Sequence, residues 1–128
     1  MLNIQIIYKM FLRGGDYILN QVILVGRLTR DISVNKGKGS KVATISLAVP
    51  RSFKNLDGNY DTDFIDCLAF DQVAENTKEY CGRGDIVGVK GRLQTRKIEE
   101  DGKSKNIMEI ITEKVTFLSS KKPEEEAD

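Results

Sequence analysis

The sequence predicts an all-β fold, one small five-stranded barrel with a short helix between its third and fourth strands. Apolar and polar residues alternate with a period of two from residue 19 onward, and many of them are β-branched. This pattern is typical of strands with one buried face. Glycine-containing turns separate the alternating stretches, and a single segment has helical spacing instead. The length of 128 residues is usual for one domain with a single hydrophobic core.

The first two strands are expected at about 19–29 and 41–53, separated by a glycine-rich turn at 36–40. Gly26 interrupts the first strand, and a glycine there indicates a bulge or the close approach of another backbone segment. Pro50 lies near the end of the second strand. Because proline cannot donate a hydrogen bond to a central ladder, we expect regular pairing of this strand to stop near Pro50.

The third strand is expected at 60–70, after a hairpin turn at 55–58. Alternation divides its side chains between two faces of the sheet. One face carries Ile65, Cys67 and Ala69, and the other carries Phe64, Asp66, Leu68 and Phe70. This register predicts that two phenylalanine side chains lie on the same side of the sheet.

A short helix is expected at 71–80, with Asp71 as its N-terminal cap and Gly82 ending it. The fourth and fifth strands follow at 85–97 and 106–118, joined by a turn at 100–102. Three strands, a helix and two strands form the element order of the OB-fold, a five-stranded Greek-key barrel. Its open face commonly binds oligonucleotides or oligosaccharides, although a fold alone does not fix a function.

Three parts are expected along the chain: a leader at 1–17, the barrel domain at 18–120 and a disordered acidic tail at 121–128. The leader has two interpretations. It is either an extra strand or arm, or translated upstream sequence, since Arg-Gly-Gly-Asp at 13–16 can be encoded by a purine-rich ribosome-binding sequence. Its short apolar stretch does not have the order of a secretory signal, and no window reaches the length of a membrane span.

Histidine is absent, and the two cysteines, Cys67 and Cys81, are too far apart for a paired metal-binding motif. A His/Cys zinc site and a Cys/His nucleophile pair are therefore excluded. No pair of carboxylates, lysines or cysteines has a spacing that indicates acid–base catalysis. We expect no catalytic residue, no metal and no cofactor, and we interpret the cysteines as buried thiols of a soluble cytoplasmic protein.

Positive charge is concentrated in one part of the chain, although the net charge is only +1. Residues 20–60 contain seven Lys or Arg and two Asp. Proteins that bind single strands without reading sequence combine aromatic rings, on which bases stack, with cations that follow the phosphates. A phenylalanine in a strand is more often buried than exposed, so this hypothesis requires the rings to lie outside the core. The candidate binding residues are Arg51, Phe53, Lys54, Tyr60, Phe64, Phe70, Arg92, Arg96 and Lys97.

Four stretches carry a resemblance to a known family. They are 19–31 (LNQVILVGRLTRD), 42–49 (VATISLAV), 64–70 (FIDCLAF) and 91–97 (GRLQTRK). In order and spacing they resemble the bacterial and phage single-stranded DNA-binding proteins, over about residues 18–120. The resemblance places Phe53, Phe64 and Phe70 at stacking positions, and Arg27, Arg92, Arg96 and Lys97 near the DNA path.

The resemblance implies sequence-independent binding of single-stranded DNA in replication, recombination and repair. It also implies a homotetramer without a membrane partner, in the bacterial cytoplasm at the nucleoid, or in the host cytoplasm if a phage encodes the protein. Three departures from the family pattern matter. Ile98 stands where the family usually has a further aromatic residue, and Asp66 adds a carboxylate to the face of the phenylalanines. The tail lacks the family's acidic-Pro-Phe tip, so replication and repair partners are not implied.

Two other functions remain open from the sequence. A primosome-type OB-fold protein would act mainly through protein partners, and it would keep its oligomeric state while failing to bind oligo-dT. A hydrolase or transferase on the same barrel would release phosphate from nucleotide substrates.

Overall fold

A computed structural model describes residues 11–13 and 16–120 of the protein. Two short strands, β1 (Phe11–Arg13) and β2 (Asp16–Ile18), pair as a separate antiparallel hairpin. The remaining elements are β3 (Val22–Leu28), β4 (Val34–Lys36), β5 (Lys41–Lys54), β6 (Tyr60–Phe70), α2 (Asp71–Tyr80), β7 (Ile86–Glu100) and β8 (Lys103–Ser119).

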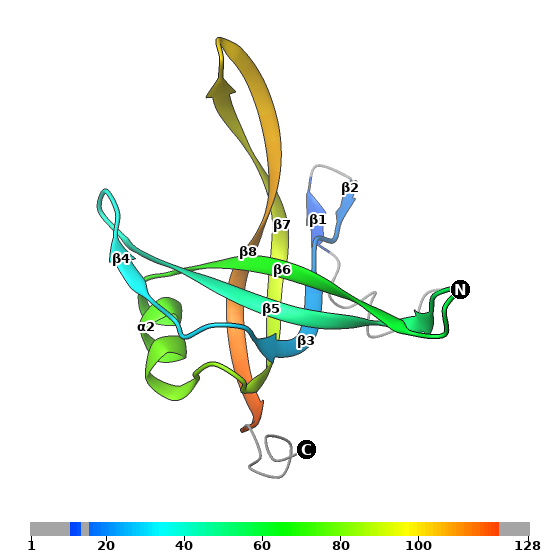
Figure 1. The fold of residues 1–128 in the computed structure, drawn as a ribbon. Coiled ribbons are helices and arrows are strands. Elements are labelled where there is room, and N and C mark those ends of the chain that lie inside the picture. The colour runs from blue at the N-terminus through cyan, green and yellow to red at the C-terminus, as the bar shows by residue number, and fades with distance from the viewer. Residues whose placement is uncertain (1–10, 14–15, 121–128) are drawn as a thin grey trace.

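The six strands β3 to β8 form one sheet in the order β3-β7-β8-β6-β5-β4, and pairing of β3 with β5 closes it. Arg27 lies opposite Ala48, and Leu28 lies opposite Leu47. Strands β6 and β8 run parallel, and the other pairs are antiparallel. The closed barrel with one helix before its fourth long strand confirms the predicted OB-fold. In Figure 1 the β5–β6 and β7–β8 hairpins extend far beyond the barrel.

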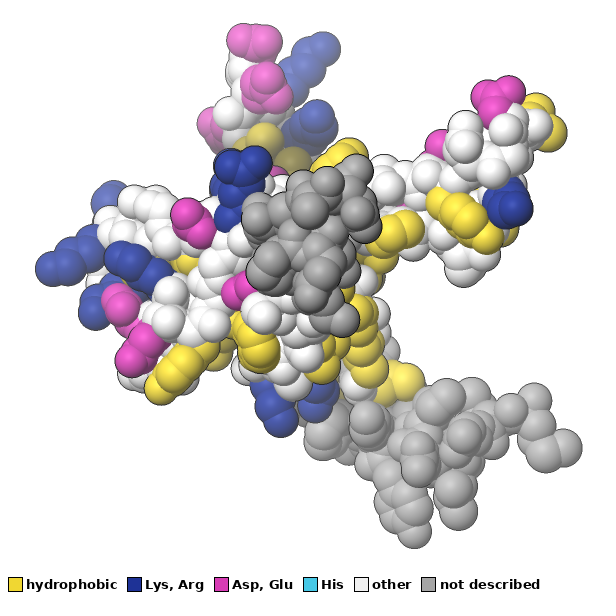
Figure 2. All heavy atoms as spheres, turned by 60° about the horizontal axis from the view of Figure 1, so that its bottom comes forward, with side chains coloured by type: hydrophobic (Ala, Val, Ile, Leu, Met, Phe, Trp, Pro, Cys, Tyr) yellow, Lys and Arg dark blue, Asp and Glu magenta, His cyan; other side chains and the backbone are white. Residues whose placement is uncertain are grey.

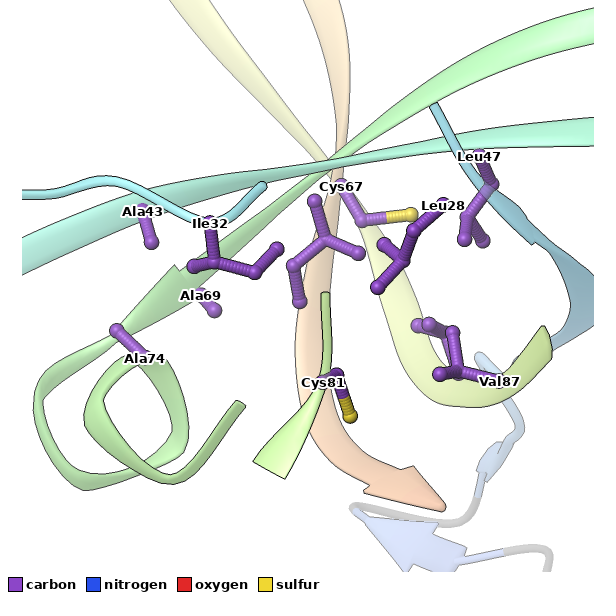
Figure 3. Packing of buried hydrophobic residues seen from close by; sticks show 11 residues of the cluster. Leu28, Ile32, Ala43, Leu47, Cys67, Ala69, Ala74, Cys81 and Val87 are labelled. Atoms are coloured by element: carbon purple, nitrogen blue, oxygen red, sulfur yellow. The ribbon is translucent and has the colours of Figure 1, made fainter. Parts of the chain in front are cut away.

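The core lies inside this barrel and is built from every second residue of the strands. Its largest fully buried side chains are Leu28, Ile45, Leu47, Cys67, Val87 and Val89. Helix α2 closes one end of the barrel with Ala74, which lies beside Ala69 in Figure 3. Complete burial of an aliphatic side chain contributes about 1.5–3 kcal/mol, so this alternating pattern fixes the side of each strand that faces inward. No helix within residues 11–13 and 16–120 is long and apolar enough to cross a membrane.

The turns of the β7–β8 and β5–β6 hairpins are formed by residue types that favour tight turns. Asp101 and Gly102 have φ values of 53° and 75°, between the paired residues Glu100 and Lys103. Two positive φ values are what a two-residue hairpin turn requires. In the β5–β6 turn, the Asn55 side-chain oxygen accepts hydrogen bonds from the backbone N–H groups of Asp57 and Asn59, at 2.9 and 3.0 Å. Both predicted hairpin turns are confirmed.

Several strand boundaries differ from those predicted. Strand β7 continues to Glu100 instead of residue 97, and β8 begins at Lys103 instead of residue 106. Strand β3 begins at Val22 instead of residue 19, because the Asn20 side chain, and not a ladder, binds the backbone N–H and carbonyl of Leu93. Strand β5 continues to Lys54, one residue past its predicted end, and its regular pairing with β6 stops after Pro50, as expected. Pairing with β3 reaches only to Ala48, and beyond it proline is tolerated because β5 has a strand partner on one side alone.

The helix has the predicted bounds, but the predicted capping role of Asp71 was wrong. Phe70 occupies the cap position without a side-chain hydrogen bond, and Asp71 is the first helical residue with φ of 49°. Its Oδ1 accepts the backbone N–H of Lys41 at 3.0 Å. The carboxylate therefore ties the start of the helix to the start of β5. The short strand β4 was not predicted.

The chain ends were predicted to be a leader and a disordered tail. Only Phe11–Arg13 and Asp16–Ile18 of the leader are described as strands. The tail at 121–128 lies outside the described residues. The division of the chain into three parts therefore stays a prediction.

Gly91 is one position where the barrel tolerates no side chain. A Cβ there would overlap the carbonyl oxygen of Ile111, whereas at Gly88, on the same strand, the nearest atom would be 3.7 Å away. We expect Gly91→Ala to lower the free energy of unfolding by about 1–3 kcal/mol, since overpacking forces the backbone to shift. Gly88→Ala is the matched control and should change it little. Urea unfolding of both variants checks this, and equal stabilities would contradict the close approach.

Candidate nucleic-acid interface

The outer face of β6 presents two phenylalanine side chains to solvent. Phe64 is 76% exposed and Phe70 is 36% exposed, while the alternate residues Cys67 and Ala69 are completely buried. Ala48 lies directly opposite Phe64 on β5, and its methyl group is too small to cover the ring. The predicted register of β6 is confirmed, and the two rings lie outside the core as the hypothesis required.

Two further aromatic side chains lie on the β5–β6 hairpin. Phe53 is 64% exposed and Tyr60 is 55% exposed. Phe53 falls in the stretch between Pro50 and Lys54 where the ladder shifts register. Lys54 lies opposite Tyr60, with its Nζ 5.8 Å from the ring centroid, within the range of a cation–π contact. The hairpin therefore combines exposed rings with a neighbouring positive charge.

Arg27 lies in the same row of the sheet as Phe64. Arg27 pairs with Ala48, and Ala48 pairs with Phe64, so the three residues follow one another across β3, β5 and β6 on one face. The half-buried Arg27 also donates from Nη1 to the carbonyl oxygen of Gly84 at 2.7 Å. This hydrogen bond holds the guanidinium group against the segment that leads into β7, on the side of β3 away from β5.

A second row connects β6 with the arginines of β7. Leu68 pairs with Ile111 in the parallel ladder, and Ile111 pairs with Arg92. By alternation, Arg96 lies on the same face as Arg92, and both share the face of the β6 phenylalanines. Lys97 is one residue further and points to the opposite face of the hairpin. The structure thus separates three basic residues that the sequence suggested as one cluster.

Three of the candidate arginines are paired with acidic side chains. Arg51 donates two hydrogen bonds to Asp63, at 3.0 and 3.1 Å, and Arg96 donates two to Glu109, both at 3.1 Å. Arg92 lies 3.6 Å from Glu113. Figure 2 shows both basic and acidic side chains on each of the two projecting hairpins. A phosphate group would therefore have to compete with a carboxylate for each of these arginines.

Asp66 lies on the face of the phenylalanines, as the sequence predicted. It pairs with Ser46 across the β5–β6 ladder, and the Ser46 hydroxyl donates to its carboxylate at 2.7 Å. Ile98, at the position of the missing aromatic residue, lies half-buried on β7 opposite Lys105. Neither residue offers a surface on which a base could stack.

The two cysteines lie away from this face. Both are free and buried, as predicted. Burial, and to a smaller extent the neighbouring Asp66, raises the pKa of Cys67 to about 11. A thiol with such a pKa stays protonated and unreactive at neutral pH. Within the described ranges, no group of three or more Cys, Asp or Glu side chains is arranged to hold a metal ion.

Sequence reasoning missed the acidic partners of the arginines. The partners are 12 and 13 residues away in sequence for Arg51 and Arg96, on the other strand of each hairpin. Counting residues back from the predicted turns could have placed Asp63 near Arg51, since cross-strand neighbours follow from the hairpin register. It also missed the exposure of Ile23 and Val25 on β3.

Comparison with known proteins finds close relatives. A model of the single-strand binding protein family matches residues 19–118. The chain is 43% identical over 113 residues to the single-stranded DNA-binding protein B of Bacillus subtilis strain 168, covering 87% of this chain and 100% of that protein. It is 44% identical over 106 residues to the single-stranded DNA-binding protein of Oceanobacillus iheyensis, covering 81% of this chain and 66% of that protein. It is 46% identical over 103 residues to the single-stranded DNA-binding protein of Bacillus cereus, covering 79% of this chain and 61% of that protein.

The pairing of Arg51 with Asp63 is testable in solution. The Arg51 guanidinium, chiefly through its hydrogen bonds, holds the pKa of Asp63 below its ordinary value. We expect Arg51→Gln to raise this pKa toward the ordinary value, because the charged carboxylate loses its partner. Carboxyl-detected NMR titration measures it, with Arg92→Gln as a control that leaves Asp63 unchanged. An Asp63 pKa that does not respond to Arg51→Gln would show that the pair does not form in solution.

Proposed function

The chain belongs to the single-strand binding protein family, and we propose that it binds single-stranded DNA without reading its sequence and without catalysing a reaction. One observation carries the proposal. Four aromatic side chains, Phe53, Tyr60, Phe64 and Phe70, are exposed on β5 and β6. Exposed rings next to basic groups are the arrangement that unpaired bases require.

Binding would proceed by stacking of successive bases on these rings. Every base has a flat π-face, so stacking tolerates any sequence. Bases in a duplex are already stacked on one another and cannot reach the rings. The protein would therefore select unpaired strands and hold them extended.

Basic side chains would neutralise the phosphates beside the rings. Arg27 lies in the row of Phe64, and Lys54 lies over Tyr60. Lys97 would contact a strand only if the DNA passes to the other face of the β7–β8 hairpin. The basic residues that we propose for this role are Arg27, Arg51, Lys54, Arg92 and Lys97. Arg96, which the sequence grouped with them, is bound to Glu109 and is considered below.

The cellular role that follows is protection of unpaired DNA during replication, recombination and repair, in the cytoplasm of a bacterium or of a phage-infected host. We propose residues 18–120 as the binding domain, which the family match at 19–118 supports. The leader and the acidic tail would lie outside it.

We further propose that the protein assembles as a homotetramer. Strand β3 pairs with β5 only at Arg27 and Leu28, so the edge of Val22–Gly26 on that side has no partner among the described strands. Ile23 and Val25 are exposed on the same strand. An open strand edge beside exposed apolar side chains favours pairing with another copy of the chain.

Stacking should carry most of the affinity that survives high salt. We expect Phe53→Ala and Phe64→Ala each to weaken binding of oligo-dT by about 1–3 kcal/mol, the range that alanine substitution gives for base stacking in proteins of this same class. Arg96→Ala should have a smaller effect, because phosphate contacts weaken as salt rises. Fluorescence anisotropy of labelled oligo-dT over a salt series, with duplex DNA as competitor, measures these affinities.

Phe117→Ala is the matched control for the loss of an exposed ring, since Phe117 is half exposed on β8 beside α2, away from the β5–β6 hairpin. It should bind oligo-dT like the unchanged protein. Failure of the unchanged protein to bind oligo-dT would refute the proposed function. Equal losses for the arginine and phenylalanine variants at high salt would refute stacking as its chief contribution.

The proposed assembly depends on the apolar side chains of β3. We expect Ile23→Asp to reduce the oligomer to smaller species, because a carboxylate buried between copies would lack a partner. Leu56→Asp is the control, since Leu56 is fully exposed at the tip of the β5–β6 hairpin. Sedimentation velocity distinguishes the two. A tetramer that persists in Ile23→Asp, or a monomeric unchanged protein, would contradict the proposed interface.

A further inference from the structure

The ion pair between Arg96 and Glu109 is bidentate, as is the pair between Arg51 and Asp63. Arg96 donates from Nε and Nη2 to the two carboxylate oxygens of Glu109, each at 3.1 Å. This bidentate geometry is the one in which a guanidinium also binds phosphate. The carboxylate therefore occupies the position on Arg96 that a DNA phosphate would take.

The pair lies on the face proposed to bind DNA. Glu109 pairs with Gln94 across β7 and β8, two positions from the row of Leu68, Ile111 and Arg92. Residues two apart on a strand share a face, so Glu109 lies on the face of the β6 phenylalanines. A strand stacked on those rings would pass near the pair.

Because Glu109 is more buried than Asp63, moving Arg96 from its carboxylate to a phosphate costs more than moving Arg51. The Glu109 side chain is only 15% exposed, whereas that of Arg96 is 55% exposed. If Arg96 moved to a phosphate, a largely desolvated carboxylate would lose its partner, and this is costly. Arg51 and Asp63 are 45% and 47% exposed, so water can replace either partner at low cost.

A second carboxylate, that of Asp66, lies on the same face of the neighbouring strand β6. Cys67 pairs with Ile110 in the parallel ladder, and Asp66 and Glu109 are the preceding residues on these two strands. Two carboxylates on adjacent strands of one face repel each other unless a cation lies between or beside them. Removing Arg96 from Glu109 would present the negative charges of both carboxylates to the phosphates.

We infer that Glu109 withholds Arg96 from the DNA backbone and thereby limits the affinity of the interface for single-stranded DNA. The inference rests on the proposed function and deepens it. Arg96 then neutralises the protein's own acidic groups, and Glu109 is a residue that determines affinity without touching the bases.

The test is Glu109→Gln, which keeps the size of the side chain and removes its charge. We expect the dissociation constant for oligo-dT at low salt to fall about tenfold, because Arg96 gains a charge-assisted contact with phosphate. The slope of log affinity against log salt should steepen by roughly 0.7, the value for one added phosphate contact on a single strand. Anisotropy of labelled oligo-dT over a salt series gives both quantities.

Two further variants separate release of Arg96 from a general change of charge. Asp66→Asn removes one negative charge from the same face, but its hydrogen-bond partner is Ser46, so it releases no guanidinium. Asp66→Asn should raise the affinity for oligo-dT less than Glu109→Gln does, and it should change the slope of log affinity against log salt little. In the double variant Glu109→Gln with Arg96→Gln, the gain should be lost. Equal effects of Glu109→Gln and Asp66→Asn, or a gain that persists in the double variant, would overturn the inference.

Thermal unfolding of each variant confirms that it is folded before binding is compared. If Glu109→Gln does not fold, Glu109→Asp replaces it, since the shorter carboxylate cannot bind both guanidinium nitrogens in the same geometry. Weaker DNA binding in a folded Glu109 variant would show that Glu109 positions Arg96 for DNA instead. If the unchanged protein does not bind oligo-dT, the proposed function fails. If it binds and Glu109→Gln binds equally well, only this inference fails.

Discussion

The register between β5 and β6 determines which side chains of the barrel face solvent. The interior is filled by small and branched side chains such as Ala69 and Cys67, which are completely buried. A slip of one residue would exchange the faces of β6 and send Phe64 and Phe70 inward. Close-packed interiors accept such added volume only with strain. The exposure of the rings therefore follows from how the core is filled, and the proposed binding surface depends on it.

The sequence predicted those features of the fold that local patterns determine. The bounds of β6 and α2 and the hairpin turns follow from alternation, helical spacing and turn residues. The start of β3 and the role of Asp71 were predicted wrongly. Each of these depends on a bond to a distant segment, and a local pattern contains no such information.

The proposed interface could be predicted in its aromatic part but not in its charged part. Strand alternation places Phe64 on the face opposite the small residues that fill the core, whereas the state of Arg96 depends on which carboxylate the hairpin register brings within its reach. A sequence window counts Arg96 as a positive charge available to phosphate. In the folded chain the same group neutralises Glu109, so a local excess of basic residues overstates the positive potential that a DNA strand would meet.

Paired arginines also change how the proposed interface would respond to salt. An arginine that already neutralises a carboxylate releases few additional counterions when DNA arrives, and counterion release is the source of salt-dependent affinity. The proposed stacking on rings such as Phe53 and Phe64 does not depend on counterion release. The net charge of +1 gives the chain only a weak long-range attraction for DNA. Its exposed rings would add contacts that only unpaired bases can make. Discrimination against duplex DNA would then come from the stacking contacts, since the phosphates of both forms attract the same cations.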